Sequence, residues 1–201
     1  MGFAAYIRKQ SERDDPCGDF ARDFLRTEKN PDVYIDTGYV SKLESETLYG
    51  FYKHLPWRIG TNDIVFQALV DLWKEWLQYQ HIGLKYKKPE KGYVYFLKLK
   101  GENAFKIGKT KKDPIIRKSQ VEIKEKVDLY LFNWLYLDNY SIIESELKNA
   151  FKKFQIQKEW YQFKHYGTTK RGKEICIEIE EAIDVYSNTD NTCKFYKKIN
   201  V

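Results

Sequence analysis

The sequence has few of the residues that build disulfide frameworks and zinc sites. Its 201 residues include three cysteines (Cys17, Cys176 and Cys193) and three histidines, all far apart in the chain. An odd number of separated cysteines fits neither a disulfide framework nor a zinc site with paired ligands. We therefore expect a reduced protein without zinc chemistry and without a Cys/His nucleophile.

Long hydrophobic runs are also missing. No apolar run approaches the roughly 20 residues that a membrane span requires, and the first residues lack the apolar segment of a signal peptide. We therefore expect no membrane association and a cytoplasmic location. The hydrophobic fraction of 42% and the aromatic fraction of 16% are sufficient for a folded core.

Charge is plentiful but unevenly distributed. The net charge is +6, yet residues 1–83 carry 10 basic and 13 acidic side chains and the remaining residues carry 25 basic and 16 acidic ones. Between Lys85 and Lys126, 14 Lys or Arg residues stand against 5 Asp or Glu. This asymmetry indicates two units with different partners, and a polyanion suits the basic one. A lysine-rich solvated surface is the alternative interpretation.

The first part of the chain has helical periodicity. Apolar residues recur at helical spacing in 3–25 and 64–77, and Asp15-Pro16 is a typical helix start. Residues 6–23 contain Asp14-Asp15-Pro16 and Gly18-Asp19, and with 72–76 they resemble the YozE-type, sterile-alpha-motif-like helical domains. The resemblance implies a small non-catalytic helical module that recruits a protein or nucleic-acid partner, or that self-associates.

The second part changes to strand-like periodicity. Strand patterns cover 93–99, 104–108 and 127–137, and helix patterns begin at Asp113 and Ser141. This order predicts an α+β fold. We place the domains at 1–83 (helical), 84–167 (α+β) and 168–201 (a helical extension that packs on the α+β unit).

A set of motifs in this second part is ordered along the chain. Gly92–Leu97 precedes Phe105–Thr110, Arg117 and Glu144 follow, and Lys158-Glu159-Trp160-Tyr161 ends the set. Together they resemble the GIY-YIG nuclease superfamily over residues 92–161. The resemblance implies a three-stranded antiparallel sheet flanked by helices, and cleavage of phosphodiester bonds with one divalent ion, Mg²⁺ or Mn²⁺.

The resemblance also implies roles for single residues. Tyr95 would activate the attacking water, Arg117 would steady the scissile phosphate, and Glu144 would hold the metal. Tyr93 shares a strand face with Tyr95 because the two are separated by two positions. A guanidinium and a metal suit this chemistry, because the transition state of phosphodiester hydrolysis carries negative charge.

Three positions depart from that family pattern. Lys106 stands where the second motif usually has tyrosine. Its ammonium would either interact with the Tyr95 phenol or contact the scissile phosphate. Lys148 replaces a frequent histidine. Glu159 is either a second acidic group of the site or a structural cap.

The sequence therefore predicts a metal-dependent DNA endonuclease, with RNA as the alternative substrate. Nucleic-acid binding is assigned to the lysines that surround the motifs: Lys109, Lys111, Lys112 and Lys148. The competing hypothesis is an inactive nucleic-acid-binding or adaptor protein that keeps the fold and has lost the chemistry.

Overall fold

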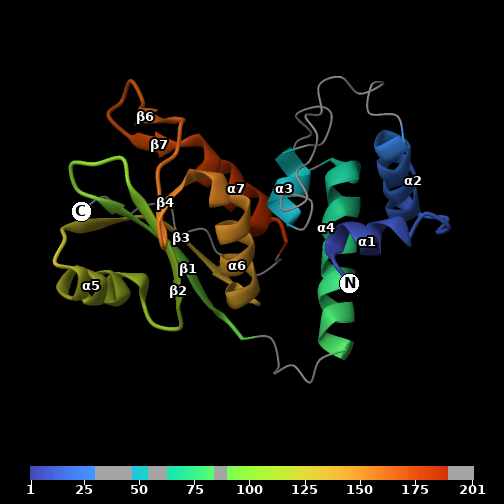
Figure 1. The fold of residues 1–201 in the computed structure, drawn as a ribbon, viewed down its shortest axis with the longest axis horizontal. Coiled ribbons are helices and arrows are strands. Elements are labelled where there is room, and N and C mark those ends of the chain that lie inside the picture. The colour runs from blue at the N-terminus through green and yellow to red at the C-terminus, as the bar shows by residue number, and fades with distance from the viewer. Residues whose placement is uncertain (30–46, 54–62, 84–89, 190–201) are drawn as a thin grey trace. The chain divides into compact units, whose positions relative to one another are not determined.

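The computed structural model describes residues 1–29, 47–53, 63–83 and 90–189 (Figure 1). The chain divides into two compact units, Met1–Lys88 and Pro89–Val201. Residues 84–89, which follow the predicted domain boundary at 83/84, lie outside the described residues, as does the end of the predicted extension, 190–201 with Cys193. Within the described ranges, every helix is too short or too polar to span a lipid bilayer.

The first unit is helical, as the periodicity predicts. Its described helices are α1 (Phe3–Arg8), α2 (Pro16–Lys29), α3 (Leu48–Lys53) and α4 (Ile64–Gly83). Pro16 occupies the first position of α2, and the Asp15 carboxylate accepts a hydrogen bond from the Gly18 amide at 2.9 Å. This is the cap that the Asp-Pro pair predicts. The aromatic ring of Phe3 packs on those of Phe51 and Trp76, which joins α1, α3 and α4 around one core.

The second unit is built on an antiparallel sheet, so the α+β class is confirmed. The strands are β1 (Gly92–Leu99), β2 (Phe105–Thr110), β3 (Leu129–Leu137), β4 (Gln155–Gln157), β5 (Trp160–Tyr161), β6 (Tyr166–Thr168) and β7 (Glu174–Cys176). The described sheet has the order β3-β1-β2-β5-β4, and β6 and β7 form a separate hairpin. The sheet is thus larger than the three strands that the sequence predicts, because β5 and β4 extend it beyond β2.

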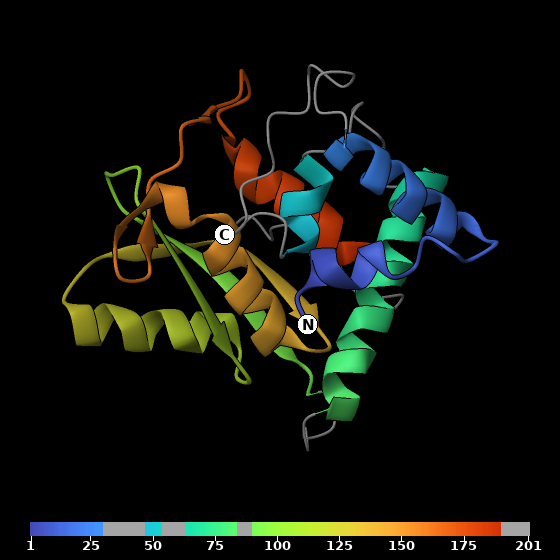
Figure 2. The same ribbon diagram turned by 45° about the vertical axis from the view of Figure 1, so that its right-hand side comes forward.

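Two helices cover opposite faces of this sheet (Figure 2). Tyr95 and Leu97 of β1 pack with Val121 of α5 (Pro114–Glu125). Gly92 faces the other side, where a Cβ atom would lie 2.8 Å from the ring of Tyr140 in α6 (Tyr140–Ala150). Because alternate residues of a strand point to opposite faces, α5 and α6 enclose β1 between them.

Two further helical segments complete the second unit. A 3-10 turn (Lys152–Phe154) links α6 to β4, and α7 (Ile177–Ser187) follows β7. The Tyr186 hydroxyl of α7 donates to the buried Glu146 carboxylate of α6 at 2.7 Å. Phe105 packs edge-on against Phe132, Phe163 and Tyr166, so this ring joins β2 to β3 and to the segment that leads into the hairpin.

Candidate functional site

Glu144 is a buried carboxylate in the middle of α6. It is only 6% exposed and lies beside Ile143 and Leu147 on the face that packs on the sheet. Its Oε1 is 2.5 Å from the ammonium of Lys148 and its Oε2 is 3.4 Å from that of Lys109. Removing a carboxylate from water is costly unless a cation compensates its charge, and here two lysines do so.

The charge pairing continues from Glu144 along the edge of the sheet. Lys148 also contacts Glu159 at 2.7 Å, and Glu159 contacts Lys106 at 3.1 Å. Lys106 in turn contacts Glu125 at the end of α5, at 2.8 Å. We call these residues, with Glu144 and Lys109, the charge network. It alternates acid and base from α6 to α5.

The network stabilises the charged forms of two of its members, Lys148 and Glu159. Burial disfavours the charged form of Lys148, but its hydrogen bonds to Glu144 and Glu159 outweigh burial and raise the pKa of the ammonium. Burial likewise opposes ionisation of Glu159, yet the hydrogen bonds from Lys148 and Lys106 lower the pKa of its carboxyl group. Both residues therefore stay charged at neutral pH.

Lys106 lies inside the network and not at an open phosphate-binding position. It is 6% exposed, and its ammonium lies 5.4 Å from the centroid of the Trp160 ring. The Trp160 indole N–H donates to Glu125, which Lys106 also contacts. Glu125 and Trp160 have no role in the sequence prediction. They lie 19 and 54 positions from Lys106, and no periodic pattern connects them.

Tyr95 is a packing residue on the α5 face. It is 2% exposed and belongs to a cluster with Leu97, Val121 and Leu129. Its ring lies against Gly108, where a Cβ atom would be 2.3 Å from the Tyr95 hydroxyl. Glycine is therefore required at position 108 for Tyr95 to take this place.

The two candidate tyrosines are separated from Glu144 by the sheet. Tyr93 packs on Trp134 and Tyr136, with ring centroids 5.4 and 4.7 Å away. It shares the α5 face with Tyr95, whereas Glu144 belongs to α6 on the opposite face. The structure thus brings Glu144, Lys148, Lys109, Glu159 and Lys106 together, and it does not bring the two tyrosines into that group.

The end of β2 is open and basic. Strand β5 pairs only with Phe105 and Lys106, and the Ile107 amide donates to the Glu159 carbonyl at 3.2 Å. No described strand pairs with β2 on this side beyond Ile107. Cationic side chains follow at once: Lys109, Lys111, Lys112 and, in the first turn of α5, Arg117.

These cations differ in how they are held. The Lys109 side chain is 40% exposed while it contacts Glu144. Lys111 pairs with Glu90 at 2.7 Å, and Arg117 donates to the Gln120 amide oxygen at 3.2 Å. Within the described part of the chain, Lys112 and Arg117 have no carboxylate partner. They can therefore take up an external anion without losing an internal ion pair.

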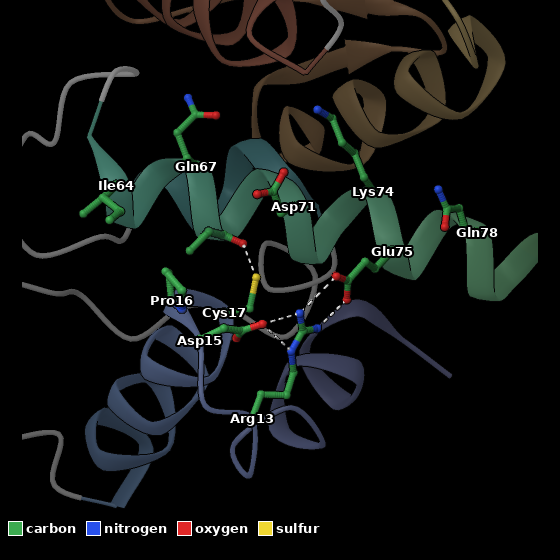
Figure 3. Close-up of a pocket in the computed structure, with 11 residues that line it drawn as sticks. Arg13, Asp15, Pro16, Cys17, Ile64, Gln67, Asp71, Lys74, Glu75 and Gln78 are labelled. Carbon is green, nitrogen blue, oxygen red and sulfur yellow. Dashed lines mark hydrogen bonds and ion pairs between the residues drawn. The ribbon is translucent and has the colours of Figure 1, made fainter.

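A concave feature lies in the helical unit (Figure 3). It is a groove of about 370 Å³ between α2 and α4, with Cys17 and Ala68 among its lining residues. Arg13 crosses it and contacts Asp15 and Glu75, each at 2.6 Å. These ion pairs connect the start of α2 to α4, so we interpret Arg13 as a structural residue.

Metal ligands are sparse around Glu144. Across the described ranges, no group of three or more His, Cys, Asp or Glu side chains is placed to hold a metal ion. Glu144 and Glu159 share Lys148 as a cationic bridge. An ion at this position would thus have to complete its coordination with water and with oxygens of a ligand.

The comparisons with known proteins correct the GIY-YIG resemblance drawn from the sequence. Residues 92–187, just under half of the chain, match the model of the T5orf172 domain family. That family is a different one from the GIY-YIG nucleases, so the GIY-YIG resemblance is wrong. The match leaves residues 1–91 uncovered, so the YozE-type resemblance of the helical unit stays a prediction. No curated protein and no solved structure matches the chain.

Proposed function

We propose that the second unit binds DNA and hydrolyses its phosphodiester bonds with the help of one divalent cation. The observation that supports this proposal most directly is the environment of Glu144. Its carboxylate is buried in α6 and held by Lys109 and Lys148 beside the basic end of β2. Folding alone does not require a charged group there, because a well-packed apolar residue is usually at least as stabilising as a buried ion pair. A buried carboxylate held by two lysines beside a basic surface is therefore a candidate functional group.

The basic residues at the open end of β2 supply the affinity for nucleic acid in this proposal. Lys109, Lys112 and Arg117 would neutralise phosphates, and each neutralised phosphate releases condensed counterions. Arg117 is suited to a bidentate contact because its planar guanidinium matches two phosphate oxygens. None of these contacts reads base edges, so binding would depend on charge and shape.

The donor set is compatible with Mg²⁺ once a phosphate is present. Mg²⁺ keeps several waters and is commonly bound by one or two carboxylates together with substrate phosphates. Oε2 of Glu144 is the oxygen that can exchange, because Lys109 holds it at 3.4 Å from an exposed position, whereas Lys148 holds Oε1 at 2.5 Å. The bound cation would neutralise phosphate charge and make a bound water more acidic.

The residues of the chain have separate tasks in this arrangement. Lys148 fixes the orientation of the Glu144 carboxylate, and Glu159 in turn holds Lys148. Lys109 is free to move from Glu144 to a phosphate oxygen, which leaves Oε2 open. Arg117 would bind the phosphate from the first turn of α5. Tyr95 contributes packing and not catalysis in this arrangement, because its ring is buried in a cluster on the α5 face.

A second candidate is a nucleic-acid-binding domain without catalysis. The observation that favours it is that both oxygens of Glu144 already face lysine ammonium groups. In that case the charge network would be purely structural, and the basic end of β2 would act alone.

A cleavage assay tests the proposal. The full chain is incubated with single-stranded DNA, double-stranded DNA and RNA, each with Mg²⁺, with Mn²⁺ and with EDTA. We expect cleavage of DNA that requires the divalent ion, and binding that persists in EDTA. DNA binding without cleavage under every condition would favour the second candidate and contradict the nuclease proposal.

The salt dependence of binding tests the basic surface separately. Lys112→Gln is expected to weaken binding about equally for all sequences and to lower the slope of log affinity against log salt concentration by about 1. Fluorescence anisotropy over a salt series measures this slope. Lys170→Gln is the matched control, since this exposed lysine lies in the turn between β6 and β7. Equal slopes for the two variants would remove Lys112 from the interface.

A further inference from the structure

The outward face of α5 carries three isoleucines that folding does not explain. Ile115, Ile116 and Ile123 are 62%, 53% and 80% exposed. The helix packs on the unit through Pro114 and Val121, its buried residues. Isoleucine has no advantage in an exposed helix, because its β-branched side chain loses rotamer freedom there and gains no burial.

Two of these isoleucines lie directly between cations. Ile115 and Ile116 occupy the first turn of α5, after Lys111-Lys112 and before Arg117. The turn itself is rigidly built. The Asp113 carboxylate accepts from the Ile115 amide at 2.7 Å, and Pro114 fixes the backbone at the first helical position. The structure therefore presents a fixed apolar pair on the proposed phosphate-binding surface.

The charge of this region selects the class of partner. Residues 109–126 contain seven Lys or Arg and three Asp or Glu. A second copy of the chain that docks through the same face would bring the same positive charge against it, which is unfavourable, whereas a polyanion is attracted. Ile123 lies two turns further along α5, about 10 Å from Ile116, so the apolar pair nearest the cations is 115–116.

We propose that Ile115 and Ile116 form an apolar wedge that enters between adjacent base pairs of a bound duplex. The inference rests on the proposed function, because the same cations would hold the flanking phosphates. Isoleucine is among the side chains that proteins insert between base steps, and the insertion costs unstacking energy. That cost is smallest where stacking is already weakened. The substrate class is therefore a distorted duplex, such as one with a mismatch or a bulge, and not a uniform one.

Duplexes that contain 2-aminopurine test the wedge. The wild-type chain is titrated into a perfect duplex and into one with a single mismatch, in EDTA, with 2-aminopurine beside the central step. We expect about 10-fold tighter binding to the mismatched duplex, which is close to the gain from burying one isoleucine side chain. We also expect a rise in 2-aminopurine fluorescence as the base unstacks.

Three variants assign the effect to the first turn of α5. The double variant Ile115→Ala/Ile116→Ala should bind both duplexes equally and lose the fluorescence rise, while its affinity for the perfect duplex stays within about 2-fold of wild type, because the phosphate contacts remain. Ile123→Ala is the matched control and should behave as wild type. Lys112→Gln should weaken binding to both duplexes alike.

The outcomes separate the wedge from the nuclease proposal. Cleavage of DNA by a wild-type chain that shows no mismatch preference and no fluorescence rise would overturn the wedge and leave the proposed function intact. Mismatch preference without cleavage would support the wedge and contradict the nuclease. An equal loss of DNA affinity in Ile123→Ala and in the double variant would also overturn the wedge, because the whole helix face would then act as one docking surface.

Discussion

Glu144→Gln is expected to reduce DNA cleavage by roughly 1,000-fold, which corresponds to about 4 kcal/mol of transition-state stabilisation. Glutamine keeps the size of the side chain and removes its charge, so the anionic ligand proposed for the divalent cation is lost. Lys148 retains Glu159 as a partner at 2.7 Å, so its ammonium is not left unpaired. DNA binding in EDTA should be unchanged or slightly tighter, because Lys109 no longer has a carboxylate to bind.

Glu146→Gln is the matched control for this variant. Glu146 lies two positions further along α6, is also buried, and accepts a hydrogen bond from the Tyr186 hydroxyl at 2.7 Å. An amide oxygen can accept the same bond, so we expect normal cleavage with a modest loss of stability. Single-turnover cleavage rates and thermal unfolding of both variants separate a loss of catalysis from a loss of stability. Equal activity of the wild type and Glu144→Gln would show that Glu144 is only a structural member of the charge network.

The helix starts and the order of the elements could be predicted because their signals are local. Asp113-Pro114 begins α5 with the capping bond that the pair implies. Runs of β-branched and aromatic residues predicted the strands β1, β2 and β3. The hairpin of β6 and β7 and the short strands β4 and β5 were not predicted, since strands of two or three residues contain too few positions to show a period.

The charge network could not be predicted because it depends on strand register. Lys106 meets Glu159 only because β5 pairs with the start of β2. Glu144 meets Lys109 only because α6 covers the face of the sheet opposite to α5. The separation of Tyr95 from Glu144 follows from the same geometry. The order of the motifs along the chain suggested that Tyr93, Tyr95 and Glu144 form one site. The pleat of β1 instead places the two tyrosines on the face covered by α5.

A clash between positions 95 and 108 should produce the second large effect, on stability. Gly108→Ala would place a methyl group 2.3 Å from the Tyr95 hydroxyl and 2.5 Å from its Cζ. The ring cannot move away freely, because it is buried against Leu97, Val121 and Leu129. We expect a loss of about 1–3 kcal/mol in the free energy of unfolding, the usual cost of overpacking.

Gly167→Ala is the control for the loss of a strand glycine. A Cβ atom at Gly167 in β6 would meet nothing within 4 Å, so alanine there should be neutral or stabilising by up to about 1 kcal/mol. Urea unfolding of the two variants gives the comparison. Similar stabilities for Gly108→Ala and Gly167→Ala would show that the contact between Tyr95 and Gly108 is easily relaxed.

A double-mutant cycle identifies Tyr95 as the source of the effect. Tyr95→Ala alone should cost about 3–5 kcal/mol, because it leaves a cavity in a packed cluster. In the Gly108→Ala/Tyr95→Ala double variant the new methyl group has no ring to meet, so the total cost should fall below the sum of the single costs by at least about 1 kcal/mol. Additive costs would mean that the Gly108→Ala penalty arises elsewhere in the sheet. A favourable coupling would establish that glycine is required at the end of β2 to admit the Tyr95 ring, independently of any catalytic role.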